Sequence, residues 1–254
     1  MFSVSIFLQK DDQHMNESFE RKLWLSTVPL VSTDVRGLPT GIASGCFVRY
    51  GEKKLLLSVQ HATGNGGIWA IQQQYVPNRG AELYRLGEVN FLMKININTS
   101  EIVDVDFSYV EVPKSTFAKR QEINPDTAEI LTEEYIFTLS SSLEDEPCTN
   151  TRYGFSGLIK PSIDQCGGNN CLVTESRVYT GLEYLRTEGD YHYFQLPFKH
   201  PGHQHFQGCS GAPIIGEDGK LVALVCGGNI ATNELWGISL KAYKLPVDVL
   251  VKGL

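Results

Sequence analysis

Short apolar segments alternate with turn residues along most of the chain. Val, Ile, Leu, Phe and Tyr dominate the segments, and Gly, Pro, Asn and Asp are frequent between them. This spacing is typical of antiparallel β-structure, because each segment has the length of a strand and each gap that of a turn. In the first half, strands are expected at residues 27–31, 45–50, 55–59, 68–75, 88–97 and 102–112. In the second half, they are expected at residues 135–139, 151–159, 171–178, 191–196, 212–215, 221–226 and 235–239.

Three further segments do not fit the strand pattern. Residues 11–24 carry acidic side chains early and basic ones late, which favours a short helix aligned with its dipole, and residues 241–252 indicate a closing helix. Residues 114–134 are polar and contain an Asn-Pro break, which is typical of a connection between domains. The predicted units are an N-terminal extension (1–26), a β-domain (27–113), a linker (114–134) and a second β-domain with a C-terminal helix (135–254).

The composition indicates a globular protein and narrows its partners. The chain has 254 residues and a formal net charge of −7, which argues against a nucleic-acid groove. No segment has the roughly 20 apolar residues of a membrane-spanning helix. The apolar run at residues 2–8 is too short for the core of an export signal. We therefore expect a cytoplasmic protein with neither a nucleic-acid partner nor a membrane anchor.

The strongest candidate for chemistry is a serine between glycines, in Gly-Cys-Ser-Gly-Ala-Pro at residues 208–213. A serine hydroxyl is a poor nucleophile at neutral pH, and it needs a base, an orienting carboxylate and donors for the developing oxyanion. Glycines around Ser210 let the backbone turn tightly, so that the N–H groups of Gly208 and Ser210 can face one oxygen. The same run also fits an ordinary turn between strands, so other residues of the chain are needed to distinguish a nucleophile from a structural turn.

A candidate base and a candidate acid precede this serine. His61 follows a predicted strand directly, where catalytic groups are often held, although a surface histidine would look the same. Asp104 and Asp106 interrupt the apolar strand at residues 102–112. Burying a carboxylate there without a hydrogen-bonding or charged partner would cost free energy, so we expect an aspartate at this place to have such a partner. Either aspartate also fits an exposed strand edge.

The order of these residues along the chain removes two alternatives. All six histidines precede Ser210, whereas an α/β-hydrolase places its histidine after the nucleophile. A subtilisin-type order beginning with Asp34 would require the alternating helices of that fold, which the pattern lacks. The order His61, Asp106, Ser210 is that of chymotrypsin, with the first two residues in one predicted β-domain and the third in the other.

The chain resembles trypsin-like serine peptidases at these residues, and it is closer to the HtrA-type core than to the digestive enzymes. The likeness is carried by residues 41–48, 56–62, 106–110, 153–157 and 208–226. It implies an all-β fold of two antiparallel six-stranded barrels, and a serine endopeptidase that acts on peptide or protein substrates without a cofactor or metal. By this resemblance, Ser210 is the nucleophile, His61 the general base and Asp106 its orienting acid, while the N–H groups of Gly208 and Ser210 form the oxyanion hole.

The resemblance also implies where a substrate would bind. Gln204 matches the base of the primary specificity pocket, with His205 beside it, so a neutral polar pocket is expected. The run at residues 200–209 contains three histidines and a cysteine, enough nitrogen and sulfur for a zinc site, but its spacing matches no standard ligand pattern, so no metal is expected. The edge expected to pair with an extended substrate backbone consists of Val225, Cys226, Gly227 and Gly228.

Two departures from the family pattern leave the activity open. Cys209 replaces the acid that pairs with a newly cleaved N-terminus in the digestive enzymes, and Ala212 stands where glycine is common. Cys209 is also an alternative nucleophile, because viral relatives use cysteine, but the glycine register favours Ser210. The alternative to an active endopeptidase is a catalytically silent module that binds extended peptides or protein partners.

Overall fold

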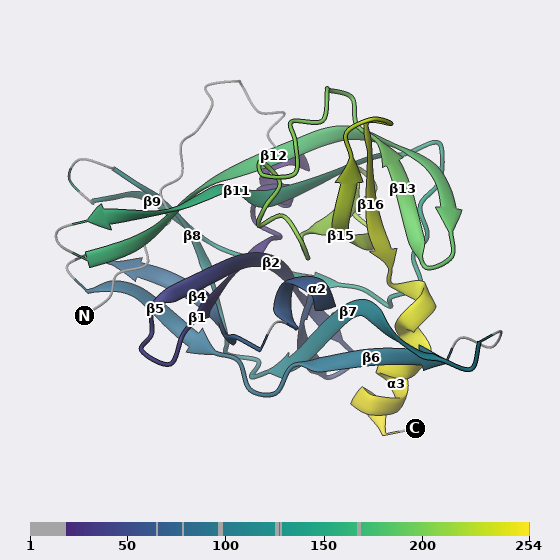
Figure 1. Cartoon of the computed structure of the whole chain (residues 1–254), viewed down its shortest axis with the longest axis horizontal. Coiled ribbons are helices and arrows are strands. Elements are labelled where there is room, and N and C mark those ends of the chain that lie inside the picture. The colour runs from purple at the N-terminus through teal and green to yellow at the C-terminus, as the bar shows by residue number, and fades with distance from the viewer. Residues whose placement is uncertain are drawn as a thin grey trace.

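Two β-rich halves pack against each other in the computed structural model (Figure 1). The structure describes residues 19–64, 66–77, 79–95, 99–124, 127, 129–166 and 169–253. Helix α1 spans Phe19–Trp24, and the chain closes with the 3-10 turn η1 at Lys241–Tyr243 and helix α3 at Lys244–Lys252. Both predicted terminal helices are therefore confirmed, although residues 11–18 of the first prediction lie outside the described residues. Of the helices described, none is both long and apolar enough to cross a membrane.

One antiparallel sheet forms most of the N-terminal half. Its strands are β1 (Val28–Thr33), β2 (Pro39–Tyr50), β3 (Lys53–Ser58), β4 (Ile68–Val76), β5 (Gly80–Arg85), β6 (Asn90–Ile95) and β7 (Ile102–Val112). Their order is β5-β4-β1-β2-β3-β7-β6, and the short strand β10 (Thr138–Ser140) pairs in parallel with β2. The short helix α2 (Gln60–Thr63) follows β3 almost directly, so its residues lie at the end of the sheet.

Strand β2 links the two parts of this sheet. Its residues 39–45 pair with β1, and its residues 46–50 pair with β3. Gly45 lies at this change of partner, where an added β-carbon would come within 2.7 Å of the carbonyl oxygen of Leu57. Glycine allows so close an approach of two backbones, and β2 therefore passes from one part of the sheet to the other without interruption.

The segment at residues 114–134 contains more regular structure than a simple connection. Its strands are β8 (Lys119–Ile123) and β9 (Ile130–Tyr135), which form a two-stranded antiparallel sheet. Arg120 in β8 is only 2% exposed. Its guanidinium donates to the carbonyl oxygens of Trp24 and Thr27, at 3.1 and 3.0 Å. These bonds attach the β8–β9 hairpin to the end of α1 and the start of the first sheet.

The C-terminal half is a closed antiparallel barrel. Its strands are β11 (Arg152–Cys166), β12 (Asn169–Glu188), β13 (Tyr191–Gln195), β14 (Pro213–Gly216), β15 (Leu221–Asn229) and β16 (Glu234–Ser239). They follow the order β11-β12-β13-β16-β15-β14, and the pairing of β14 with β11 closes the barrel. Strands β11 and β12 continue beyond the predicted strands 151–159 and 171–178 and project from the barrel as a long hairpin (Figure 1).

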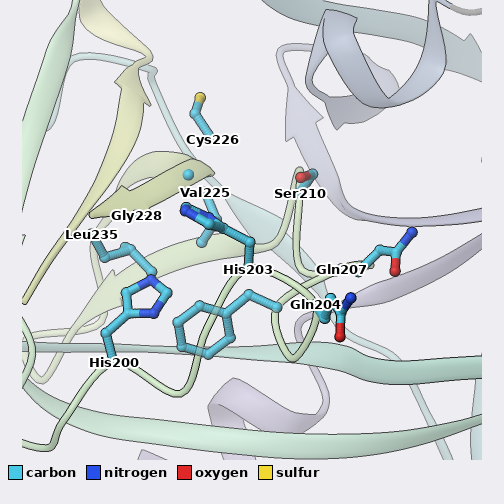
Figure 2. Close-up of a pocket in the computed structure, with 11 residues that line it drawn as sticks. His200, His203, Gln204, Gln207, Ser210, Val225, Cys226, Gly228 and Leu235 are labelled. Atoms are coloured by element: carbon cyan, nitrogen blue, oxygen red, sulfur yellow. The ribbon is translucent and has the colours of Figure 1, made fainter. Parts of the chain in front are cut away.

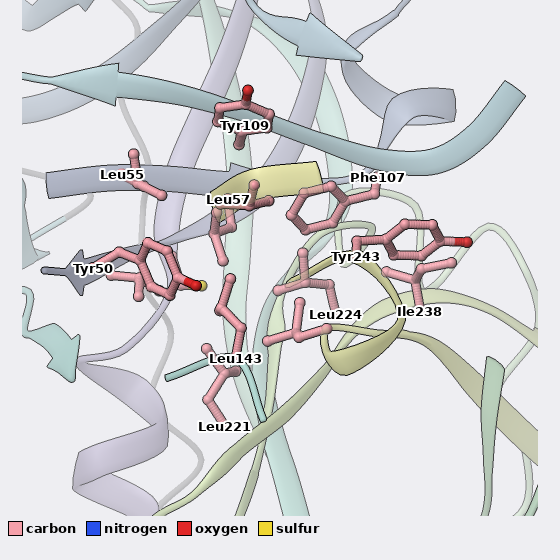
Figure 3. Packing of buried hydrophobic residues seen from close by; sticks show 14 of the residues in the cluster. Tyr50, Leu55, Leu57, Phe107, Tyr109, Leu143, Leu221, Leu224, Ile238 and Tyr243 are labelled. Atoms are coloured by element: carbon pink, nitrogen blue, oxygen red, sulfur yellow. The ribbon is translucent and has the colours of Figure 1, made fainter. Parts of the chain in front are cut away.

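A shared hydrophobic cluster joins the two halves (Figure 3). Leu57 and Phe107 from the N-terminal half pack in it with Leu224 and Ile238 of the barrel and with Tyr243 of η1. The rings of Phe107 and Tyr243 stack with their centroids 5.8 Å apart. Each half also has a separate cluster of buried apolar side chains. The halves are therefore joined by core packing as well as by the covalent chain.

The predicted all-β architecture is confirmed. The barrel of the C-terminal half has the expected six strands, whereas the N-terminal half has seven strands in one path with β10 attached. Strand β5 and the β8–β9 hairpin are additions to the prediction. Their sequences, GAELYR, KRQEI and ILTEEY, are short and do not alternate regularly between apolar and polar residues over a full strand, so they lack the pattern from which strands are predicted.

Candidate active site

His61, Asp106 and Ser210 come together from three elements in both halves. His61 lies in α2, Asp106 in β7, and Ser210 in the loop before β14. Nε2 of His61 is 2.9 Å from Oγ of Ser210, and Nδ1 is 2.8 and 2.9 Å from the two carboxylate oxygens of Asp106. The backbone N–H of His61 also donates to Asp106, at 3.0 Å. The three residues singled out in the sequence therefore form one continuous chain of contacts.

These contacts assign the protons in the site. A carboxylate only accepts hydrogen bonds, so Nδ1–H of His61 donates to Asp106. In the neutral form of the ring, Nε2 is then without a proton, and it accepts from the hydroxyl of Ser210. Burial acts to raise the pKa of Asp106, but hydrogen bonds from the ring and backbone of His61 lower that pKa below its usual value. Asp106 is therefore charged at neutral pH and can orient the His61 ring.

Burial and surroundings distinguish Asp106 from Asp104. Asp104 is exposed, whereas the side chain of Asp106 is 18% exposed. Cys226 of β15 lies near the Asp106 carboxylate, and its Sγ donates to the carbonyl oxygen of Leu224 at 3.5 Å. Burial, together with the nearby Asp106 charge, raises the pKa of the Cys226 thiol well above its usual value, so the thiol stays protonated. Cys226 thus lies near the candidate acid and also belongs to the expected substrate edge.

The loop that carries Ser210 is held by strand β2. The backbone N–H of Ser44 donates to the carbonyl oxygen of Ser210 at 2.9 Å. The Ser44 hydroxyl donates to the carbonyl oxygen of Gly208 at 2.7 Å. The hydroxyl of Ser58 donates in turn to the carbonyl oxygen of Ser44 at 2.8 Å. Gly211 has a φ of +87°, and an added β-carbon would overlap the Ser44 carbonyl oxygen and the Ser58 hydroxyl. Only glycine therefore fits beside the serine.

Two backbone N–H groups of this loop have no acceptor in the part of the chain that the structure describes. Within the described chain, the N–H groups of Gly208 and Ser210 donate to no protein acceptor, whereas those of Cys209 and Gly211 donate to backbone carbonyl oxygens at 2.9 and 2.8 Å. Gly208 has a φ of +117°, and an added β-carbon would come within 2.9 Å of the Leu158 carbonyl oxygen. Available N–H groups near a nucleophile are what stabilisation of a developing oxyanion requires.

Cys209 is not placed to act as the nucleophile. Its side chain is fully buried, and Sγ donates to the carbonyl oxygen of Leu158 at 3.4 Å. The thiol packs so closely on Gly157 that an added β-carbon there would overlap it. Burial also raises the pKa of Cys209, which disfavours the reactive thiolate. Ser210 is the nucleophile candidate that contacts a base.

A pocket of about 460 Å³ opens beside Ser210 (Figure 2). Of the residues expected to bind substrate, Gln204, Val225, Cys226, Gly227 and Gly228 line this pocket together with Ser210. Gln204 is nevertheless exposed to solvent, which places it at the rim rather than at a buried base of the pocket. The expectation that Gln204 forms the base is therefore corrected.

The histidines of the preceding loop differ from the sequence expectation. His205 is not among the residues that line the pocket, because its Nε2 is 2.7 Å from the hydroxyl of Tyr179. His200 lines the pocket instead and is 4% exposed. No sequence pattern marks His200, since only the path of the loop decides which histidine faces inward. Among the described residues, no group of three or more His, Cys, Asp or Glu side chains is arranged to hold a metal ion.

Solved structures with little sequence identity share this fold. Human heparin binding protein aligns with 10% identity and a TM-score of 0.57, over 92% of this chain and 94% of its own. The serine endoprotease from Yersinia pestis aligns with 11% identity and a TM-score of 0.50, over 95% of this chain and 67% of its own. The fold is the chymotrypsin fold of serine proteases. At these identities the likeness establishes the fold alone, and neither a protein-family model nor a curated protein sequence matches the chain.

Proposed function

We propose that the protein is a serine endopeptidase that cleaves extended peptide or protein substrates through His61, Asp106 and Ser210. The observation that carries the proposal is the chain of contacts from Asp106 through His61 to Ser210, at 2.8 and 2.9 Å. The chymotrypsin fold supports it, because that fold uses the same residue types in the same chain order.

Each group has one role in the proposed reaction. Oγ of Ser210 attacks the carbonyl carbon of the scissile bond while its proton passes to Nε2 of His61. The N–H groups of Gly208 and Ser210 stabilise the oxyanion, and His61 returns the proton to the leaving amine. Water, activated by His61, then hydrolyses the ester formed on Ser210. Asp106 holds Nδ1–H of His61 and stabilises the charged ring between these steps.

One edge of strand β15 supports substrate binding. Strand β15 pairs with β14 as far as Leu224, but with β16 as far as Asn229. In the described chain, one edge of residues 226–228 therefore has no strand partner. An extended peptide can add there as a further strand and pass beside Ser210. Val225 lies before this free edge, because its N–H and carbonyl groups are bonded to the loop that carries Ser210.

A fluorophosphonate probe tests the nucleophile. Such a probe reacts with an activated serine hydroxyl without requiring a particular peptide sequence. We expect labelling of the wild type at Ser210, and loss of labelling in Ser210→Ala and His61→Ala. For a peptide substrate, kcat should fall by about 10⁴- to 10⁶-fold in these variants.

Asp106→Asn and Asp104→Asn form a matched pair on one strand. Asp106→Asn keeps the shape of the side chain but favours the wrong tautomer of His61, so kcat should fall by about 10⁴-fold. Asp104 is exposed, and Asp104→Asn should leave kcat unchanged. An equal loss in both variants would contradict the role of Asp106.

The silent binding module predicts a different set of results. In that case, the wild type is not labelled by the probe. It would also bind an extended peptide as tightly as Ser210→Ala does, without cleaving it. These two results together would replace the endopeptidase proposal.

A further inference from the structure

His200 is a buried histidine on the wall of the pocket beside Ser210. Its side chain lines the pocket together with that of Leu235 (Figure 2). Phe206 also lines the pocket. The His200 ring meets the Phe206 ring edge to face, with the centroids 5.0 Å apart. The wall of the pocket therefore combines apolar surface with one polar ring.

Asn233 fixes the position of His200. The backbone N–H of His200 donates to Oδ1 of Asn233 at 2.6 Å. The side-chain amide of Asn233, in the turn between β15 and β16, donates to the carbonyl oxygens of Leu196 and Phe198 at 3.0 and 2.8 Å. The loop that carries His200 is thereby tied to the barrel, so the ring is positioned before a substrate arrives.

The contacts of the His200 ring assign its proton. The backbone N–H of Gly202 donates to Nδ1 at 3.0 Å, so Nδ1 is an acceptor and the neutral ring carries its proton on Nε2. Burial lowers the pKa of His200, and the nearby His203 and His205 lower it further. The ring is therefore neutral at pH 7, with Nε2–H as its donor.

This Nε2 donor has no partner. In the part of the chain that the structure describes, Nε2 of His200 is buried without a hydrogen bond. It lies against Gly228 of the free β15 edge, where an added β-carbon would overlap it. Buried donors in native proteins are nearly always paired, because leaving one unpaired is costly. A donor left unpaired between a pocket and a substrate edge points to an acceptor on the substrate.

We propose that His200 determines specificity and selects glutamine at P1, the substrate residue whose carbonyl is attacked. This inference rests on the proposed endopeptidase function. The side-chain carbonyl of glutamine accepts from Nε2–H of His200. No Lys, Arg, Asp or Glu of the described chain lines the pocket. A charged P1 side chain would therefore be buried without an opposite charge, whereas a neutral amide would not incur that cost.

Peptides that differ only at P1 test the assignment. The set contains glutamine, glutamate, methionine and lysine, and methionine matches the length of glutamine without its carbonyl group. We expect kcat/KM for glutamine to exceed that for methionine by about 10- to 100-fold, because methionine leaves the buried donor unpaired. Equal cleavage of the glutamine and methionine peptides would overturn the proposal, as would faster cleavage of the glutamate or lysine peptide.

His200→Phe and His205→Phe form a matched pair of variants. His200→Phe keeps an aromatic ring but removes the donor, so the glutamine-to-methionine ratio should fall to near one. His205 is bonded to Tyr179 and does not line the pocket, so His205→Phe should keep the wild-type ratio. Gly228→Ala is a second test, because its added methyl group displaces Nε2 while His200 is retained, and it should lower the ratio too. Fluorophosphonate labelling reports whether each variant retains a competent Ser210.

A binding measurement separates this inference from the proposed function. Calorimetry on Ser210→Ala can compare two peptide acids that end in glutamine or methionine, which resemble the N-terminal products of cleavage. Binding of the glutamine peptide about 10-fold more tightly supports the role of His200 whether or not the wild type is labelled. Labelling of the wild type together with equal affinities would overturn the P1 assignment and leave the endopeptidase proposal standing.

Discussion

At the scale of single residues, the geometry around Ser210 depends on how closely two backbones approach. Gly211 lies directly against the carbonyl oxygen of Ser44, which also accepts a hydrogen bond from Ser58 at 2.8 Å. A side chain at residue 211 would push the loop away from β2 and break the bonds from Ser44 to residues 208 and 210. The distance between Ser210 and His61 thus depends on the absence of one methyl group.

Gly211→Ala is expected to abolish fluorophosphonate labelling. Gly37→Ala is the control, because Gly37 has nearly the same φ, +81°, and no atom lies within 4 Å of its added β-carbon. The positive φ alone should cost both variants about 1–2 kcal/mol in the free energy of unfolding, measured with urea. The overlap should displace the nucleophile in Gly211→Ala only. Equal labelling of both variants would contradict this account.

The candidate catalytic residues are predictable from the sequence, whereas those of the pocket are only partly so. His61, Asp106 and Ser210 lie in or beside strands with a clear apolar pattern. Their order along the chain excludes the α/β-hydrolase fold, and the lack of alternating helices excludes the subtilisin fold. Gln204 and His205 are predicted by counting back from Ser210. The loop at residues 200–207 has no regular periodicity, so counting cannot show that His200 faces inward while His205 does not.

At the scale of elements, the β8–β9 hairpin shows why some strands escape prediction. Arg120 and Gln121 of β8 are 2% and 6% exposed. The side-chain amide of Gln121 accepts from the Tyr75 N–H at 2.5 Å and donates to the Tyr75 carbonyl oxygen at 3.1 Å. Polar side chains therefore attach this hairpin by bonding to the backbone of other elements. Such bonds leave no apolar alternation in the sequence, and the segment looks like a linker.

Arg120→Met is expected to loosen this attachment. It removes the donors for the carbonyl oxygens of Trp24 and Thr27, so the free energy of unfolding should fall by about 2–4 kcal/mol. Arg36→Met is the control, because the Arg36 side chain is 74% exposed and its pair with Asp34 should contribute less than about 1 kcal/mol. Urea unfolding of both variants measures the difference. Equal, small effects would show that Arg120 is dispensable.

At the scale of the whole molecule, the shared cluster around Phe107 and Tyr243 joins the two halves. Phe107 is fully buried and directly follows Asp106, so the same strand contributes to the site and to the joint core. Because the cluster contains side chains from both halves, opening one half exposes apolar surface of the other. The chain is therefore expected to unfold as one cooperative unit.

Thiol reactivity in urea tests this cooperativity. Cys46 and Cys209 are both fully buried, one in each half, and both should become reactive over the same range of urea concentration. Phe107→Ala should lower the free energy of unfolding by about 3–5 kcal/mol and shift both thiols together. Phe91→Ala, at a 40% exposed position, should change it by less than about 1 kcal/mol. Separate transitions for the two thiols would mean that the halves unfold independently.

The bonds from Ser44 to the nucleophile loop also set when the proposed chemistry can begin. Ser44 is among the first residues of the fold to be synthesised, and Ser210 is among the last. The loop takes its final geometry only when the completed barrel docks on β2, because the donors that bond the carbonyl oxygens of Gly208 and Ser210 both belong to Ser44. A chain whose barrel is incomplete therefore lacks the geometry that places Ser210 beside His61. For the proposed endopeptidase, completion of folding would thus be the step that starts activity, and an unfinished chain would not cleave itself or its neighbours.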